Sequence, residues 1–106
     1  MVARGDIWLT ALDPTLGSEI QKTRPCVVVS PPELHDHLRT AIVAPMTTEG
    51  RPAPFRIPVT LNRKQGFILL DQIRTVDKVR LVKLEGSIDA STLGSALGAL
   101  QEVFAD

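Results

Sequence analysis

The chain has few aromatic residues and no tyrosine. Its 106 residues include only three Phe and one Trp. Proteins that bind single-stranded nucleic acid by stacking its bases rely on exposed aromatic side chains. Adaptor domains that bind proline-rich peptides need an aromatic groove in the same way. The composition therefore argues against both classes of binding protein.

A second cysteine and a long apolar run are also missing. Cys26 stands alone, so it cannot form an internal disulfide, and nothing indicates an oxidising compartment. No stretch approaches the ~20 apolar residues of a membrane-spanning helix, and the first residues do not resemble a signal peptide. We therefore expect a cytoplasmic protein without membrane contact.

Net charge is zero as well, but the charges are unevenly distributed along the chain. Residues 51–83 contain eight Lys and Arg against two Asp, whereas residues 84–106 contain four acids and no base. A basic segment of this kind can bind phosphates, although it can equally be a solvated sheet face. The zero total therefore does not exclude a nucleic-acid ligand.

Length and composition predict one small, mainly β domain over residues 1–106. Hydrophobic residues make up 43% of the chain, and most are Val, Leu or Ile. Short apolar runs separated by Pro, Gly and Asn favour a strongly bent barrel. We predict strands over 5–12, 25–30, 40–46, 55–60, 67–70, 72–76 and 79–88, with a hairpin turn at Asn62–Gly66. The run Val27–Val29 should be buried on both faces, and Pro58 should lie in an edge strand.

After residue 88 the apolar period becomes helical. Leucines and a phenylalanine recur at helical spacing, and either Asp89 or Ser91 can cap the helix. Two glycines inside this helix each cost about 1 kcal/mol relative to alanine. Close packing would account for Gly94 and Gly98. The chain is thus predicted to end in one helix packed on the barrel.

Two familiar chemical groups are weak candidates here. His35 and His37 suggest acid–base chemistry or a metal site, but no further ligand accompanies them, so a surface loop is the favoured interpretation. Cys26 precedes an apolar run, which favours burial over a role as nucleophile. We expect no metal and no cofactor.

Polar residues that bound the second and third predicted strands are more informative. Ser18, Glu19 and Arg24 surround one loop, and Thr47 and Thr48 follow the next strand. Arginine binds phosphate in a fork, and a threonine hydroxyl can donate to a phosphoryl oxygen. Such groups suit a reaction in which the RNA 2′-hydroxyl attacks the adjacent phosphate. Residue types alone leave this open, because Thr and Arg are also common in turns.

Several segments, in order, resemble the MazF/PemK family of toxin endoribonucleases from bacterial toxin–antitoxin pairs. They are Arg4-Gly5-Asp6-Ile7-Trp8, Asp13-Pro14-Thr15-x-Gly17-Ser18-Glu19, Arg24-Pro25-x-Val27-Val28-Val29-Ser30, Ala41-Ile42-Val43-Ala44-Pro45-x-Thr47-Thr48 and Leu70-Asp71-Gln72-Ile73-Arg74-Thr75-Val76-Asp77. The resemblance covers nearly the whole chain.

The resemblance implies a homodimer of SH3-like (PemK/CcdB-like) barrels that cuts single-stranded RNA, such as mRNA, at short sequence motifs without a metal. It implies 2′,3′-cyclic phosphate and 5′-hydroxyl products, and a cognate MazE-like antitoxin that covers the RNA groove with an acidic segment. By position, Arg24 and Thr47 resemble the catalytic residues, with Glu19 as a base or as a support for Arg24. The substrate contacts implied in the same way are Ser18, Thr48, Asp71, Gln72 and Arg74.

A non-enzymatic toxin is the alternative. Gyrase-binding toxins resemble this chain in architecture and act by binding. They rely on a C-terminal Trp-Gly-Ile ending, whereas this sequence ends Glu102-Val103-Phe104-Ala105-Asp106. The difference favours the ribonuclease.

Overall fold

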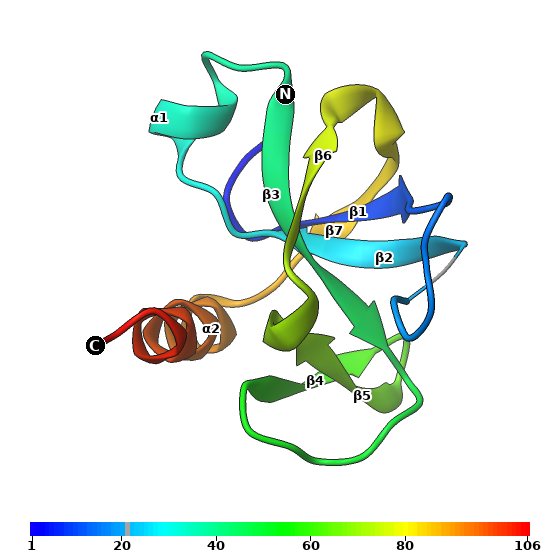
Figure 1. The fold of residues 1–106 in the computed structure, drawn as a ribbon, viewed down its shortest axis with the longest axis vertical. Coiled ribbons are helices and arrows are strands. Elements are labelled where there is room, and N and C mark those ends of the chain that lie inside the picture. The colour runs from blue at the N-terminus through cyan, green and yellow to red at the C-terminus, as the bar shows by residue number, and fades with distance from the viewer. Residues whose placement is uncertain (21) are drawn as a thin grey trace.

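The computed structural model describes residues 1–20 and 22–106, and β-strands dominate it (Figure 1). The elements in chain order are β1 (Asp6–Ala11), β2 (Thr23–Val28), α1 (Pro32–His35), β3 (Thr40–Thr47), β4 (Arg56–Leu61), β5 (Lys64–Leu69), η1 (Leu70–Gln72), β6 (Arg74–Asp77), η2 (Lys78–Arg80), β7 (Leu81–Ser87) and α2 (Ala90–Val103). The predicted mainly β domain with a C-terminal helix is confirmed.

The strands form one antiparallel sheet in the order β4-β5-β3-β2-β1-β7. Strand β3 organises it, because its first half pairs with β6 and its last two residues pair with β5. Its other edge pairs with β2. Since β3 changes partner along its length, the sheet bends strongly, and α2 packs against β4 and η1 (Figure 1). The result is the small barrel that the sequence predicts.

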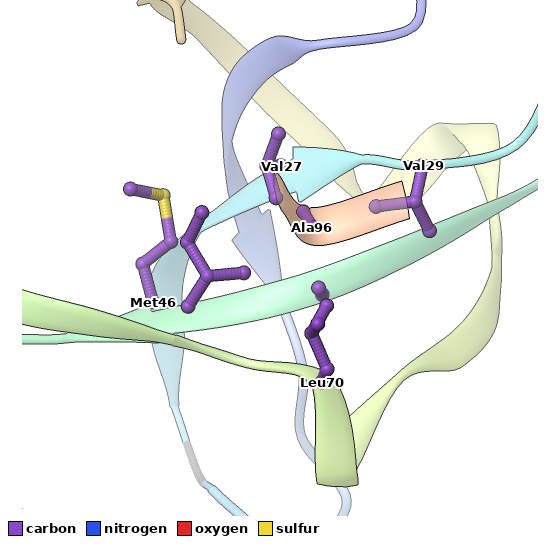
Figure 2. Packing of buried hydrophobic residues seen from close by; sticks show 7 residues of the cluster. Val27, Val29, Met46, Leu70 and Ala96 are labelled. Carbon is purple, nitrogen blue, oxygen red and sulfur yellow. The ribbon is translucent and has the colours of Figure 1, made fainter. Parts of the chain in front are cut away.

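Two apolar clusters lie on opposite faces of β2 and β3. Figure 2 shows the first, in which α2 contributes Ala96 and η1 contributes Leu70. The buried members of this cluster are Val27, Val29, Ala44, Met46, Ile68, Leu70 and Ala96. The buried members of the second are Leu12, Cys26, Val28, Val43 and Val76. Because alternate residues of β2 enter different clusters, the predicted burial of Val27–Val29 on both faces is confirmed.

The predicted hairpin exists, but its turn is shorter than Asn62–Gly66. Leu61 pairs with Lys64, so only Asn62 and Arg63 form the turn. Both have positive φ, 50° and 66°, as a two-residue turn of type I′ requires. Gly66 is therefore not a turn residue but lies within β5. The edge position predicted from Pro58 is confirmed, since β4 ends the sheet order.

The C-terminal helix is capped as predicted but packs differently. Asp89 Oδ1 accepts a hydrogen bond of 2.7 Å from Thr92 N. Phe104, expected on the packed face, is 72% exposed, and Ala96 is fully buried instead. A Cβ added at Gly94 or Gly98 would have no neighbour within 4 Å. Close packing therefore does not account for these glycines, and that expectation is wrong.

The two histidines differ from the surface loop expected for both. His37 is exposed, but His35 is fully buried because α1 folds its ring against the start of β3. Its Nδ1 shares a hydrogen bond of 2.9 Å with Ser30 Oγ, which also accepts from Ile42 N at 3.2 Å. A single helical turn has too few residues to show an apolar period, so no sequence pattern indicates this burial.

Candidate active site

Arg24 and Thr47 lie where β2 begins and β3 ends. In the antiparallel pair, Cys26 is opposite Pro45 and Val27 is opposite Ala44. The paired residues end at Cys26 and Pro45, so Arg24 lies two residues before the ladder on β2 and Thr47 lies two residues after it on β3. Side chains two residues apart on a strand point to the same face. Arg24 and Thr47, 23 positions apart in the sequence, therefore lie on one face at the same end of the strand pair.

Both side chains lie at the rim of the second apolar cluster. They continue the face of the sheet that carries Cys26 and Val43, but they are only partly buried. Arg24 also pairs with Thr10 of β1, which is fully buried. A positive charge and a hydroxyl at the water-accessible edge of an apolar face can meet a ligand phosphate without being fully desolvated.

The Thr47 hydroxyl is held by the turn that follows it. Thr47 Oγ1 accepts a hydrogen bond of 3.0 Å from Glu49 N. Because a hydroxyl can accept and donate at once, its proton stays available for a second partner. Thr48, the next residue, is exposed. The Thr47 hydroxyl thus has a fixed position and can still donate a hydrogen bond to a ligand.

Glu19 and Ser18 lie in the loop between β1 and β2. Glu19 Oε1 accepts from Leu16 N at 2.6 Å, and Glu19 N donates to Leu16 O at 3.1 Å. The carboxylate is therefore folded onto its own turn, while both Ser18 and Glu19 remain exposed. Its predicted role as a base stays a prediction.

Five of the eight predicted site residues line one surface pocket of about 860 Å³. The pocket lies between residues 14–20 and residues 71–74. The predicted residues that line it are Ser18, Glu19, Asp71, Gln72 and Arg74. Arg24, Thr47 and Thr48 are not among its lining residues. The structure thus separates the predicted set into a strand-end pair with its neighbour Thr48 and a pocket group.

Three residues of the pocket group already bind other parts of the chain. Asp71 accepts from Arg56 Nη2 at 3.3 Å and from its Nε at 3.4 Å. Gln72 Oε1 accepts from Ile20 N at 2.8 Å. Arg74 Nη1 donates to Leu12 O at 3.0 Å. These contacts hold the β1–β2 loop and β4 around η1. The substrate contacts predicted for these residues stay predictions.

Several bases of the segment 51–83 likewise bind other parts of the chain. Besides Arg56 and Arg74, Arg80 Nη1 donates to Ala11 O at 3.1 Å and to Asp13 O at 2.6 Å. Sequence reasoning missed these internal roles, because main-chain acceptors carry no sequence signal. Exposed bases of the segment lie on separate elements: Arg51 follows β3, Arg63 and Lys64 are at the β4–β5 turn, and Lys83 is on β7.

Cys26 lies behind the site, two residues from Arg24 on the same strand. Burial raises the pKa of its thiol to about 11, although the Thr10 hydroxyl and the Arg74 charge partly oppose this. A thiol with this pKa is protonated at neutral pH and is a poor nucleophile. The predicted burial is confirmed.

Within residues 1–20 and 22–106, no three His, Cys, Asp or Glu side chains are grouped so that they could hold a metal ion. No helix of this described part is long and apolar enough to cross a membrane. The groups that the site presents are a guanidinium, hydroxyls and a carboxylate.

Comparisons with known proteins agree with the sequence resemblance. The chain matches the family of PemK-like, MazF-like toxins of type II toxin–antitoxin systems over residues 3–104. It is 36% identical to endoribonuclease PemK of Escherichia coli over 94% of this chain and 80% of that protein. It is also 36% identical to endoribonuclease EndoA of Bacillus subtilis, over 95% of this chain and 92% of that protein.

Solved structures show the same fold. A MazF toxin of Mycobacterium tuberculosis has a TM-score of 0.77 at 25% identity, covering 93% of this chain and 95% of that one. MazF of Deinococcus radiodurans has a TM-score of 0.80 at 23% identity, covering 95% of this chain and 93% of that one. A mycobacterial endoribonuclease in complex with its cognate antitoxin has a TM-score of 0.80 at 20% identity, covering 96% of this chain and 93% of that one. With a family match that spans residues 3–104, this chain belongs to the PemK-like, MazF-like toxins of type II toxin–antitoxin systems.

Proposed function

We propose that this protein is an endoribonuclease toxin that cleaves single-stranded RNA at short sequence motifs without a metal ion. The single observation that carries the proposal is the β2–β3 pairing, which leaves Arg24 and Thr47 on one face at the same end of the strand pair. Family membership and two endoribonuclease relatives at 36% identity support the reaction class.

In the proposed reaction the substrate supplies the nucleophile. The 2′-hydroxyl oxygen attacks the adjacent phosphorus, the bond to the 5′-oxygen breaks, and that oxygen leaves with a proton as a 5′-hydroxyl. The other fragment keeps a 2′,3′-cyclic phosphate. Negative charge develops on the phosphoryl oxygens during the attack, and a fixed cation stabilises it most strongly where water is partly excluded.

Arg24 and Thr47 would divide this work. The Arg24 guanidinium stabilises the charged phosphoryl oxygens by donating to them in a fork. The Thr47 hydroxyl donates to the same phosphoryl group, with its oxygen already bonded to Glu49 N. Glu19 is the carboxylate proposed to accept the 2′-hydroxyl proton after leaving Leu16 N, or to orient Arg24 instead.

The pocket between residues 14–20 and residues 71–74 is the proposed place for part of the RNA. Ser18, Glu19, Asp71, Gln72 and Arg74 line it, and Thr48 extends from the end of β3. Amide, hydroxyl and guanidinium groups of this kind read base edges and phosphates without aromatic stacking. The scarcity of aromatics is therefore compatible with an RNA ligand.

We further infer that the protein acts in the cytoplasm as a homodimer and is neutralised by a MazE-like antitoxin. The fold match to an endoribonuclease in complex with its cognate antitoxin supports such a partner. An acidic antitoxin segment would compete with RNA for Arg24 and the exposed bases.

The test uses a long RNA and the purified protein in excess EDTA. We expect fragments that end in 2′,3′-cyclic phosphate and 5′-hydroxyl groups, and sequencing of their 5′ ends then gives the motif. In an oligonucleotide with that motif, one 2′-deoxy substitution at the cut should block cleavage, whereas the same substitution two nucleotides away should not. Strict dependence on added metal, 3′-hydroxyl products, or intact RNA with inhibited DNA gyrase would overturn the proposal.

A further inference from the structure

Gly66 lies in β5, beside the end of β3. It is buried and pairs with Val59 of β4 on one side. On the other side, Phe67 pairs with Thr47, so the register continues from Gly66 to Thr48. Gly66 is therefore in the middle strand of three, next to the peptide that joins the two threonines.

No side chain fits at this position. A Cβ on Gly66 would overlap the carbonyl oxygen of Thr47, and it would lie 3.0 Å from the Thr47 carbonyl carbon and 3.1 Å from Thr48 Cα. All three are main-chain atoms, so no flexible side chain can move away. The φ of Gly66 is not in the positive region, so glycine is needed for space and not for its backbone conformation.

The atoms that a methyl group would displace are those that place the Thr47 hydroxyl. Thr47 is fixed by two sets of contacts: its pairing with Phe67 and its Oγ1 bond to Glu49 N. Any shift of the Thr47 carbonyl disturbs the pairing with Phe67 and moves the hydroxyl relative to β2, whose pairing with β3 ends at Pro45. A displacement of about 1 Å in a reacting group can cost about 10²-fold in rate.

We propose that Gly66 is a positioning residue, which allows β5 to press against the Thr47–Thr48 peptide and so fixes the Thr47 hydroxyl relative to Arg24. The inference rests on the proposed function, in which Thr47 contacts the phosphoryl group. It assigns Gly66 no contact with RNA.

The test is Gly66→Ala, made in a chain that also carries Gly94→Ala and Gly98→Ala. Those two helix positions have no neighbour within 4 Å of an added Cβ, so the background gains stability without a change at the site. The matched control is Val59→Ala in the same background. Val59 is the ladder partner of Gly66 and packs on the core, so this control weakens the hairpin without touching Thr47.

Three measurements are compared between the two variants. We expect Gly66→Ala to lower the single-turnover cleavage rate by about 10²-fold, and Val59→Ala to leave it within about threefold, at equal folded fraction. Affinity for an RNA with a 2′-deoxy cut site should be unchanged in both, because no binding group is altered. Amide NMR signals of Thr47 and Thr48 should move only in Gly66→Ala.

Equal cleavage rates in the two variants would overturn the assignment, and so would a parallel loss of RNA affinity in Gly66→Ala. Failure of Gly66→Ala to fold in the stabilised background would also overturn it, since glycine would then be required for the fold and not for Thr47. If the parent chain itself does not cleave RNA, the proposed function fails, while the amide signals still report whether Gly66 fixes Thr47.

Discussion

The two ends of the β2–β3 strand pair place polar side chains in opposite environments. At the end near α1, Ser30 and His35 are buried and bonded to each other, and Ser30 also accepts from Ile42 N. At the other end, Arg24 and Thr47 are only partly buried, and Glu19 and Thr48 in the loops that adjoin these strands are exposed. One end is closed by a helical turn, and the other is open to a ligand.

This contrast shows that candidate groups in a small barrel can be ranked by their accessibility. Histidine is the more usual catalytic residue, yet here it is enclosed, and its Nε2 has no hydrogen-bond partner among residues 1–20 and 22–106. The buried ring contributes to stability through its bond to Ser30, and no ligand can reach it. Accessibility at a strand end, and not residue type, distinguishes Arg24 and Thr47 from the buried Ser30–His35 pair.

The largest expected effect is at the open end. Arg24→Ala and Thr47→Ala should each lower RNA cleavage by at least about 10²-fold, because each removes a group that stabilises developing phosphoryl charge. Single-turnover cleavage and thermal unfolding of the purified variants measure this. Thr23→Ala, on the exposed position next to Arg24, is the matched control and should keep activity. Full activity in either variant would remove that residue from the site.

At the closed end, His35→Ala should destabilise the fold by about 2–4 kcal/mol, because it leaves a cavity and removes the Ser30 partner. Urea unfolding measures the free energy, and cleavage per folded molecule should not change. His37 lies two residues later and is exposed. The free energy of unfolding of His37→Ala should therefore stay within about 0.5 kcal/mol of the parent value. A His35 variant that folds fully but does not cleave would contradict the division between the two ends.

Cys26 lies just inside the open end, and the pKa of its thiol reports whether water reaches this position. Its folded pKa is about 11 against an ordinary value of 9.0, so the unfolded thiol loses its proton first as pH rises. Ionisation of the unfolded chain then lowers stability by about 1.4 kcal/mol per pH unit above pH 9, until the folded pKa is reached. Unfolding of the parent and Cys26→Ala from pH 8 to 10.5 isolates this slope. Equal slopes would show that water reaches the thiol.

The smallest effect is expected in α2, away from both ends. Gly94→Ala and Gly98→Ala should each stabilise the protein by about 0.5–1 kcal/mol, because alanine favours the helix and nothing obstructs its methyl group. Denaturant unfolding checks the sign. Ala96→Gly, at the buried helix position between them, should destabilise instead. Changed cleavage in the stabilised variants would show that α2 is coupled to the site.

Much of the fold could be predicted from local sequence because the signals are local. The apolar run Val27–Val29 indicated a buried strand, Pro58 indicated an edge, and the helical period with Asp89 before it indicated a capped helix. The turn at Asn62–Arg63 was extended wrongly to Gly66, because glycine is common both in turns and where two backbones approach closely. Only the position of β3 distinguishes these two uses.

The site was predicted less completely. Arg24 and Thr47 came from the resemblance, and no residue pattern showed that they lie at the same end of one strand pair. The bonds of Gln72 to Ile20 N and of Arg74 to Leu12 O join segments more than 50 residues apart. The burial of His35 depends on how one turn of helix folds over a distant strand.

Four features follow from the sequence, because they depend on neighbouring side chains or on an ordered set of motifs: the strand-rich class, the buried centre of β2, the helix cap and the family. Three follow only from the folded chain: which polar groups are open to a ligand, which arginines bind the chain itself, and why residue 66 must be glycine. Those properties depend on distances between segments that only long-range pairing brings together.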